Sequence, residues 1–143
     1  MTINQALKEK NVLAGQVSKL KDRILQNNRF VKGEVPAYNT TTLLHEFRAK
    51  LAELVDLKTK IAVATVPMVG VIIHMAELKS LIGTLKILPA KAGTEVARYS
   101  AAEGTVYDVT IGEVERDSLV EEMEGQLRMA QDKLDTFNAT TII

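Results

Sequence analysis

The chain contains two histidines, and the second of them, His74, is followed three residues later by Glu77. On a helix this spacing places an imidazole and a carboxylate on one face, as in the metal sites of helical bundles. Such sites need several Glu and His side chains from facing helices, and the sequence contains no repeated Glu-x-x-His pattern. We therefore expect no metal ion and interpret the pair first as a contact at a helix interface.

A larger set of polar and aromatic residues extends from position 74 to position 107. The residues that we expect to bind a ligand are His74, Glu77, Lys79, Arg98, Tyr99 and Tyr107. Arg and Lys bind phosphate groups, and Tyr can stack on a base. At a subunit interface these side chains would line a pocket for a small anionic, nucleotide-like ligand. The alternative is that they form hairpin surface and ion pairs, and the sequence leaves both interpretations open.

No residues with catalytic chemistry fall into a recognisable motif. The chain has no Cys and therefore no thiolate chemistry. It has no Gly-rich phosphate loop, and none of its serines has a nearby His with an orienting acid in a known pattern. We expect a protein that is not an enzyme and that carries no cofactor.

Apolar residues recur at every third or fourth position through most of the chain: from Ile3 to Val31, from Leu44 through Phe47, Leu51 and Leu54 to Ile61, and from Val120 to Phe137. This period is typical of helices that pack along other helices. The segment after residue 94 is instead rich in Val and Tyr, which favour strands. We expect helices over about 3–31, 43–66, 67–88 and 112–137, and a β-hairpin over about 95–111. The prediction is a mainly α fold with one domain over 1–143, an antiparallel coiled-coil-like bundle of long helices with a small β-hairpin before the C-terminal helix.

Several helix starts are marked by capping residues. Thr2 and Gln5 have the spacing of a capping box, and so do Thr110 and Glu113 before the last helix. The polar cluster that begins at Asn39 offers side-chain oxygens to cap the second helix. These positions predict where three of the helices begin.

The run from Ile61 to Ile73 contains no charged residue and includes Pro67. Proline lacks an N–H and clashes with the preceding turn, so we expect a kink or a short break there. The run is shorter than the roughly 20 residues needed to cross a bilayer. We therefore expect a buried core or interface segment and no membrane partner. The tail, residues 138–143, is expected to dock as an extended segment.

Opposite charges are concentrated in the first and last helices. Residues 1–32 carry seven Lys or Arg and two acids, a net charge of +5, whereas residues 112–137 carry eight acids and three basic residues, a net charge of −5. Flanking charges of opposite sign set partner and orientation in helical assemblies. We expect the two helices to lie side by side, in one chain or between chains, and long helices with little interior predict a homo-oligomer. A basic stripe for an anionic ligand on the first helix is the alternative.

The charge of the whole chain limits its partners further. The formal net charge is zero, whereas a general nucleic-acid-binding domain is usually basic, so we expect no nucleic-acid partner. The first residues lack the basic and then apolar run of a signal peptide. We expect a cytoplasmic protein of a bacterium or of a phage-infected host cell.

Two segments resemble a family of small, uncharacterised bacterial and phage proteins, some labelled septicolysin-like. Residues 20–65 have the family's basic first helix ending in an Asn pair, its acidic Pro-containing link and its Leu-rich second helix, and the closing DKLDTFNATTII is similar to the family's acidic helix and Asn-containing tail. Ala139 stands where many relatives have Trp. The resemblance implies a helical coiled-coil protein and brings no activity with it. A Cys-free chain with no signal peptide and a modest apolar run is a poor pore former, whatever the label.

Together these features predict a non-enzymatic, homo-oligomeric binding protein that holds a small anionic nucleotide-like ligand at a subunit interface. A small phage protein that sequesters a host immune signal, and so acts against host defence, would be built in this way. The alternative is a structural or scaffold protein, such as a virion component, with no small-molecule ligand.

Overall fold

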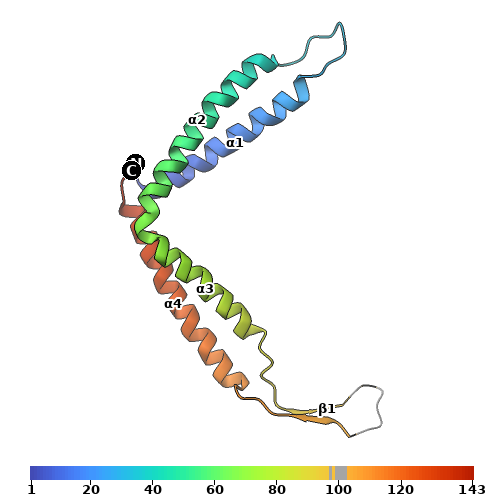
Figure 1. Cartoon of the computed structure of the whole chain (residues 1–143), viewed down its shortest axis with the longest axis vertical. Helices are drawn as coiled ribbons and strands as arrows, with labels where there is room; N and C mark the ends of the chain where they lie inside the picture. Colours follow the sequence, from blue (N-terminus) through green and yellow to red (C-terminus); the bar gives the residue numbers. More distant parts are fainter. Residues whose placement is uncertain (97, 99–102) are drawn as a thin grey trace. The chain divides into compact units, whose positions relative to one another are not determined.

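The computed structural model describes residues 1–96, 98 and 103–143. In chain order the described elements are α1 (Ile3–Asn27), α2 (Thr40–Thr65), the 3-10 turn η1 (Val66–Met68), α3 (Val69–Lys86), β1 (Gly93–Glu95), β2 (Thr105–Tyr107) and α4 (Glu113–Thr140) (Figure 1). The mainly α fold with a small antiparallel hairpin before the C-terminal helix is therefore confirmed. The chain groups into two compact units, one of residues 1–67 with 136–143 and the other of residues 68–135.

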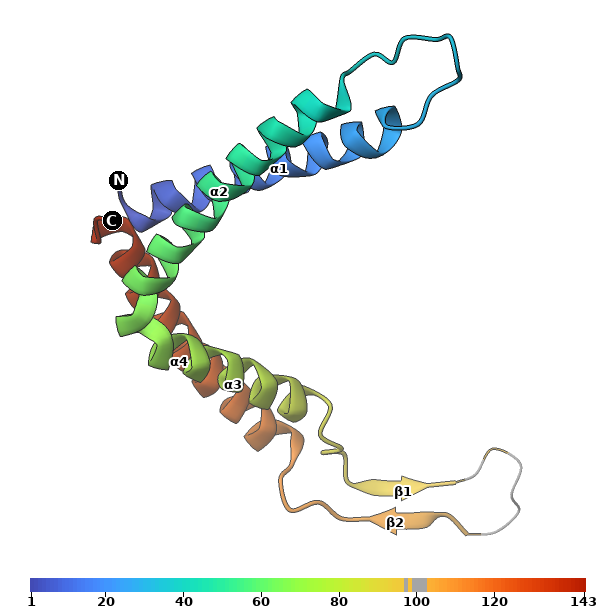
Figure 2. The ribbon, with the colours of Figure 1, turned by 45° about the horizontal axis from the view of Figure 1, so that its top comes forward.

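The first unit is built on an antiparallel pair of helices, α1 and α2, which lie side by side (Figure 2). Its core joins the start of α1 to the end of α2, because Ala6 and Leu13 pack with Leu54 and Leu57. The cap predictions hold at both helix starts. Thr2 and Gln5 form the complete capping box, and the Asn39 side chain accepts a hydrogen bond from the backbone N–H of Thr42 at 3.1 Å.

Helix α1 ends at Asn27, four residues before the predicted end at Val31, which is exposed. The Asn27 side-chain amide donates to the carbonyl oxygen of Arg23 at 2.7 Å, and Asn28 is the C-cap. Asn side chains compete with the backbone for hydrogen bonds and so favour helix ends. The Asn pair therefore ends the helix at residue 27, although apolar residues continue at helical spacing as far as Val31.

The predicted buried face of α2 is confirmed in part. Leu54 of that face is buried and Ile61 packs against the core, whereas Leu44 and Leu51, which the sequence also placed there, are exposed. Leu43 and Leu57 are buried instead. Leu43 and Leu54 are eleven residues apart, which is close to three turns of a helix with 3.6 residues per turn, so they lie on the same face.

The two ends of the chain are joined by backbone hydrogen bonds. The N–H of Ile3 donates to the Thr141 carbonyl at 3.0 Å, and the N–H of Ile143 donates to the Met1 carbonyl at 2.9 Å. Thr2 and Ile142 form an antiparallel bridge, and Ile143 packs against the core of the first unit. The tail docks in extended form as predicted, but only from Thr141 on, because α4 continues to Thr140.

In the second unit α3 and α4 run alongside each other (Figure 2). Met75, Leu78 and Ile82 of α3 are buried, while the apolar residues of α4 are at most half-buried. A salt bridge of 2.9 Å joins the Lys86 ammonium to the Glu124 carboxylate across the pair. The capping box predicted at Thr110 is wrong. Helix α4 begins at Glu113, and the Gly112 carbonyl accepts its first hydrogen bond, so Thr110 lies before the cap position.

The uncharged run from Ile61 to Ile73 is not core within the chain. All of its residues are described, and none is buried. Pro67 lies in the 3-10 turn η1, which is the short break that the proline predicted. By length and composition alone, the helical stretch Thr40–Lys86 contains a window of 18 residues apolar enough to cross a membrane, and only 11% of that window is buried. The burial part of the prediction is therefore wrong, and the interface part stays a prediction.

Candidate functional site

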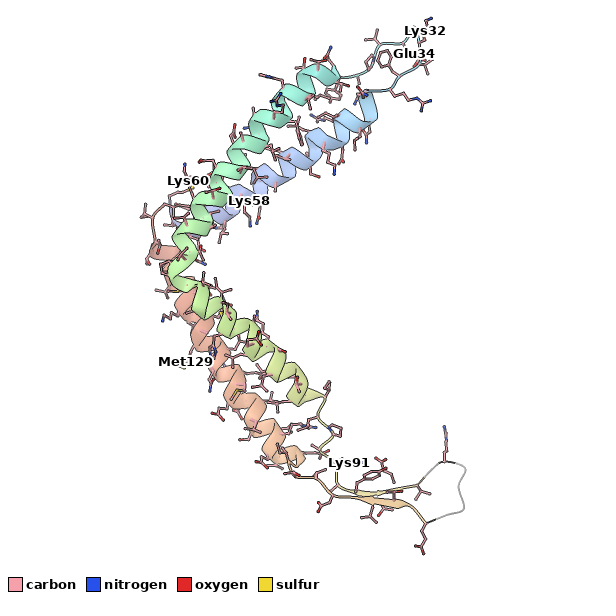
Figure 3. The ribbon with its side chains drawn as sticks, in the orientation of Figure 1. Lys32, Glu34, Lys58, Lys60, Lys91 and Met129 are labelled. Atoms are coloured by element: carbon pink, nitrogen blue, oxygen red, sulfur yellow. The ribbon has the colours of Figure 1, made fainter. Side chains whose placement is uncertain are left out.

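His74 is the predicted site residue that the structure places in a hollow. It lines an open groove of about 370 Å³ between α3 and α4, together with Gly70 and Val71 of its own helix and Met129, Ala130 and Lys133 of α4. Met129 projects from α4 with 75% of its surface exposed (Figure 3). The groove is apolar apart from the imidazole and the Lys133 ammonium. It offers one cation and one imidazole nitrogen to a ligand.

The other predicted residues do not line this groove. Glu77 and Lys79 are exposed on α3, and Lys79 lies five residues beyond His74, well round the helix from it. Arg98 is exposed after β1, and Tyr107 is exposed on β2; Tyr99 lies outside the described residues. Within the part of the chain that the structure describes, the predicted site residues therefore do not converge on one cavity.

The hairpin holds Tyr107 on a tightly packed backbone. Tyr107 pairs with Gly93 across the hairpin. Gly93 has a φ of 135°, which glycine adopts readily and other residues rarely adopt. A Cβ at Gly104 would lie 2.6 Å from the Thr94 Cγ2 and 2.7 Å from the Glu95 carbonyl oxygen. Only glycine therefore fits position 104 without a shift of the facing strand. All six strand residues are exposed, so the hairpin presents both of its faces to solvent.

A second hollow, which the prediction of site residues missed, lies in the first unit. The α1–α2 groove has a volume of about 390 Å³ and is lined by Gln16, Lys19, Leu20 and Arg23 of α1 and by Glu46, Ala49 and Lys50 of α2. Leu20 is only 9% exposed, so its side chain forms part of an apolar floor. Three cations and one carboxylate surround that floor.

The charged groups of the α1–α2 groove have different partners. The Lys50 ammonium forms a salt bridge of 2.8 Å with Glu53, which does not line the groove. The Arg23 guanidinium carbon lies 4.8 Å from the centre of the Tyr38 ring, a cation–π contact. Neither Lys19 nor Arg23 forms a salt bridge with another described residue. The sequence did indicate a basic stripe on the first helix, but the contribution of α2 depends on how the two helices pack.

The two grooves have a similar lining, in which apolar side chains lie next to cationic ones. Among the described residues no cluster of three or more His, Asp or Glu side chains is placed to hold a metal ion. Each groove combines apolar wall with cations, the composition of a site for a small anion with an apolar part. Comparisons with known proteins add nothing to this picture, since no family model, curated protein or solved structure matches the chain.

Proposed function

We propose that this chain is the protomer of a homo-oligomer, and that the assembly is a non-enzymatic binding protein for a small anionic, nucleotide-like ligand. The observation that carries the proposal is the surface that the helices of the two units leave exposed.

Much of this exposed surface is apolar. Large apolar side chains are exposed on every described α-helix: Val12 and Leu25 on α1, Val55 and Val63 on α2, Ile73 and Leu81 on α3, and Val114 and Met129 on α4. Removal of such side chains from water stabilises an assembly by about 25 cal/mol per Å². A second copy of the chain is the partner that accounts for apolar stripes on all of these helices.

The charge distribution supports the same partner. Within the first unit basic α1 packs along α2, and within the second unit acidic α4 runs along α3. The side-by-side packing of α1 and α4, in one chain or between chains, stays a prediction. The net charges of +5 over residues 1–32 and −5 over residues 112–137 would complement each other between two chains. Complementary flanking charges then set the register of the assembly.

The ligand half of the proposal uses the residues predicted from the sequence. Lys79, Arg98 and Tyr107 are exposed and free of salt bridges with other described residues. A second chain would bring together side chains that one chain holds apart. Arg and Lys would then donate charge-assisted hydrogen bonds to phosphate, and Tyr would stack on a base. In a phage-infected cell such an assembly would sequester a nucleotide-like immune signal without destroying it.

Native mass spectrometry of protein purified from its own cells tests both halves together, because it gives the subunit number and detects any co-purifying small molecule. The interface is tested by Ile73→Asp, with Val35→Asp in the α1–α2 loop as the matched control. Both residues are exposed within the chain, so both variants should fold, and only Ile73→Asp should dissociate. A monomeric wild type at micromolar concentration would refute the oligomer. An assembly with no bound molecule and no heat with cyclic or linear nucleotides would favour the scaffold alternative.

A further inference from the structure

We propose that the α1–α2 groove is a binding site for a small phosphomonoester of the size of a nucleoside monophosphate. This site is separate from the residues of the proposed function, and it needs no second chain, because all seven lining residues belong to the first unit. The groove is therefore complete within one chain.

The geometry of the groove follows from the packing of two helices. Gln16, Leu20 and Arg23 are spaced by one turn each on α1 and so follow one edge of the seam. On the opposite wall α2 contributes Ala49, whose single methyl group takes up less space than a longer side chain would. Leu20 is nearly buried beside this space. The volume of about 390 Å³ is within the usual range for small-molecule sites.

The charge of the groove selects an anion. Lys19 and Arg23 lie four residues apart on one helix, and like charges at this spacing destabilise a helix. The carboxylate beside them, Glu46, forms no salt bridge with a described residue, and Lys50 pairs with Glu53 instead. A phosphate group between Lys19 and Arg23 would neutralise both cations and accept two hydrogen bonds from the planar guanidinium.

Tyr38 orients the arginine for this role. Its ring, 43% exposed, lies under the Arg23 guanidinium at 4.8 Å. The contact restricts the rotamers of a side chain that would otherwise be free in water, so less conformational entropy is lost when a phosphate binds. Because Tyr38 immediately precedes Asn39, the N-cap of α2, its backbone is held by the start of that helix.

The remaining groups define the body of the ligand. Leu20 and Ala49 offer an apolar surface for a planar or aliphatic part. Glu46 accepts hydrogen bonds and repels a second negative charge, so it favours a ligand with hydroxyl or amino donors beyond its phosphate. A nucleoside monophosphate has all three features. A bare phosphate satisfies only the cations and should bind more weakly.

Calorimetric titration of the full chain with AMP, inorganic phosphate and adenosine tests the site. AMP should bind more tightly than inorganic phosphate, and adenosine should give no heat. Arg23→Ala should weaken AMP binding by about 10- to 100-fold, the usual effect of losing a hydrogen bond to a charged group. Arg23→Lys should lose part of the affinity, since it keeps the charge without the planar fork. Glu46→Gln should tighten binding.

The matched control is Lys21→Ala, which removes a cation from the same helix at a position that does not line the groove. Its AMP affinity should equal that of the wild type, and circular dichroism should show the same helix content in every variant. AMP binding should also survive Arg98→Ala and the Ile73→Asp variant. Equal losses in Arg23→Ala and Lys21→Ala, or no heat with AMP at millimolar concentration, would overturn the inference. If AMP binding is lost in Arg98→Ala but not in Arg23→Ala, AMP binds at the site predicted from the sequence instead.

Discussion

The substitution Leu20→Asp places a carboxylate in the seam between α1 and α2. Leu20 is 9% exposed and lies at the floor of the α1–α2 groove. Loss of a nearly buried leucine side chain costs about 2–5 kcal/mol. Desolvation of the new carboxylate adds to that cost. The open groove and the nearby Lys19 and Arg23 offset part of it, so we expect a net loss of about 2–4 kcal/mol in the free energy of unfolding.

The matched control places the same carboxylate at an exposed polar position of the same helix. Ser18 lies on α1, is exposed and does not line the groove, so Ser18→Asp should change the free energy of unfolding by about 0.5 kcal/mol or less. Denaturation in urea, followed by circular dichroism and by sedimentation, measures unfolding and dissociation separately. Leu20→Asp should shift the unfolding midpoint and dissociate the proposed assembly. If the two variants lose the same stability, the seam that we describe between α1 and α2 is not the one that holds the first unit together.

Three further predictions concern the second unit and the exposed apolar run. Arg98→Ala should weaken binding of a nucleotide-like ligand at the predicted site by about 1.5–3 kcal/mol in calorimetry, with helix content and subunit number unchanged; an altered subunit number would instead assign Arg98 to the interface. If a second copy covers Ile61–Ile73 as we propose, the wild-type protein should stay in the aqueous fraction when mixed with liposomes; stable flotation with the vesicles would revive a membrane role. Gly104→Ala should increase amide hydrogen exchange in the hairpin, since the added Cβ would lie 2.6 Å from the Thr94 Cγ2. Gly83→Ala, where the added Cβ meets nothing within 4 Å, should instead stabilise α3 by up to about 1 kcal/mol.

The local features of the fold were readable from the sequence because they depend on neighbouring residues. The capping box of Thr2 and Gln5 and the Asn39 cap involve residues three apart, and both are present. Pro67 interrupts the α-helix with a 3-10 turn, as predicted, because the missing N–H and the ring clash are properties of proline itself and do not depend on the surrounding structure. The apolar period of the last helix was also correct, since residues from Val120 to Phe137 at the predicted positions are half-buried.

Tertiary packing decided which of two neighbouring leucines is buried at the start of α2, and it decided where the groove lies. Leu43 is buried and Leu44 is exposed, and this choice depends on how the two helices pack against each other. Packing likewise placed Ala49 and Lys50 of α2 opposite Lys19 and Arg23 of α1, residues almost thirty positions apart in the sequence. An apolar run such as Ile61–Ile73 has the same composition whether a core or a partner covers it, so its exposure within the chain could be learned only from the three-dimensional structure.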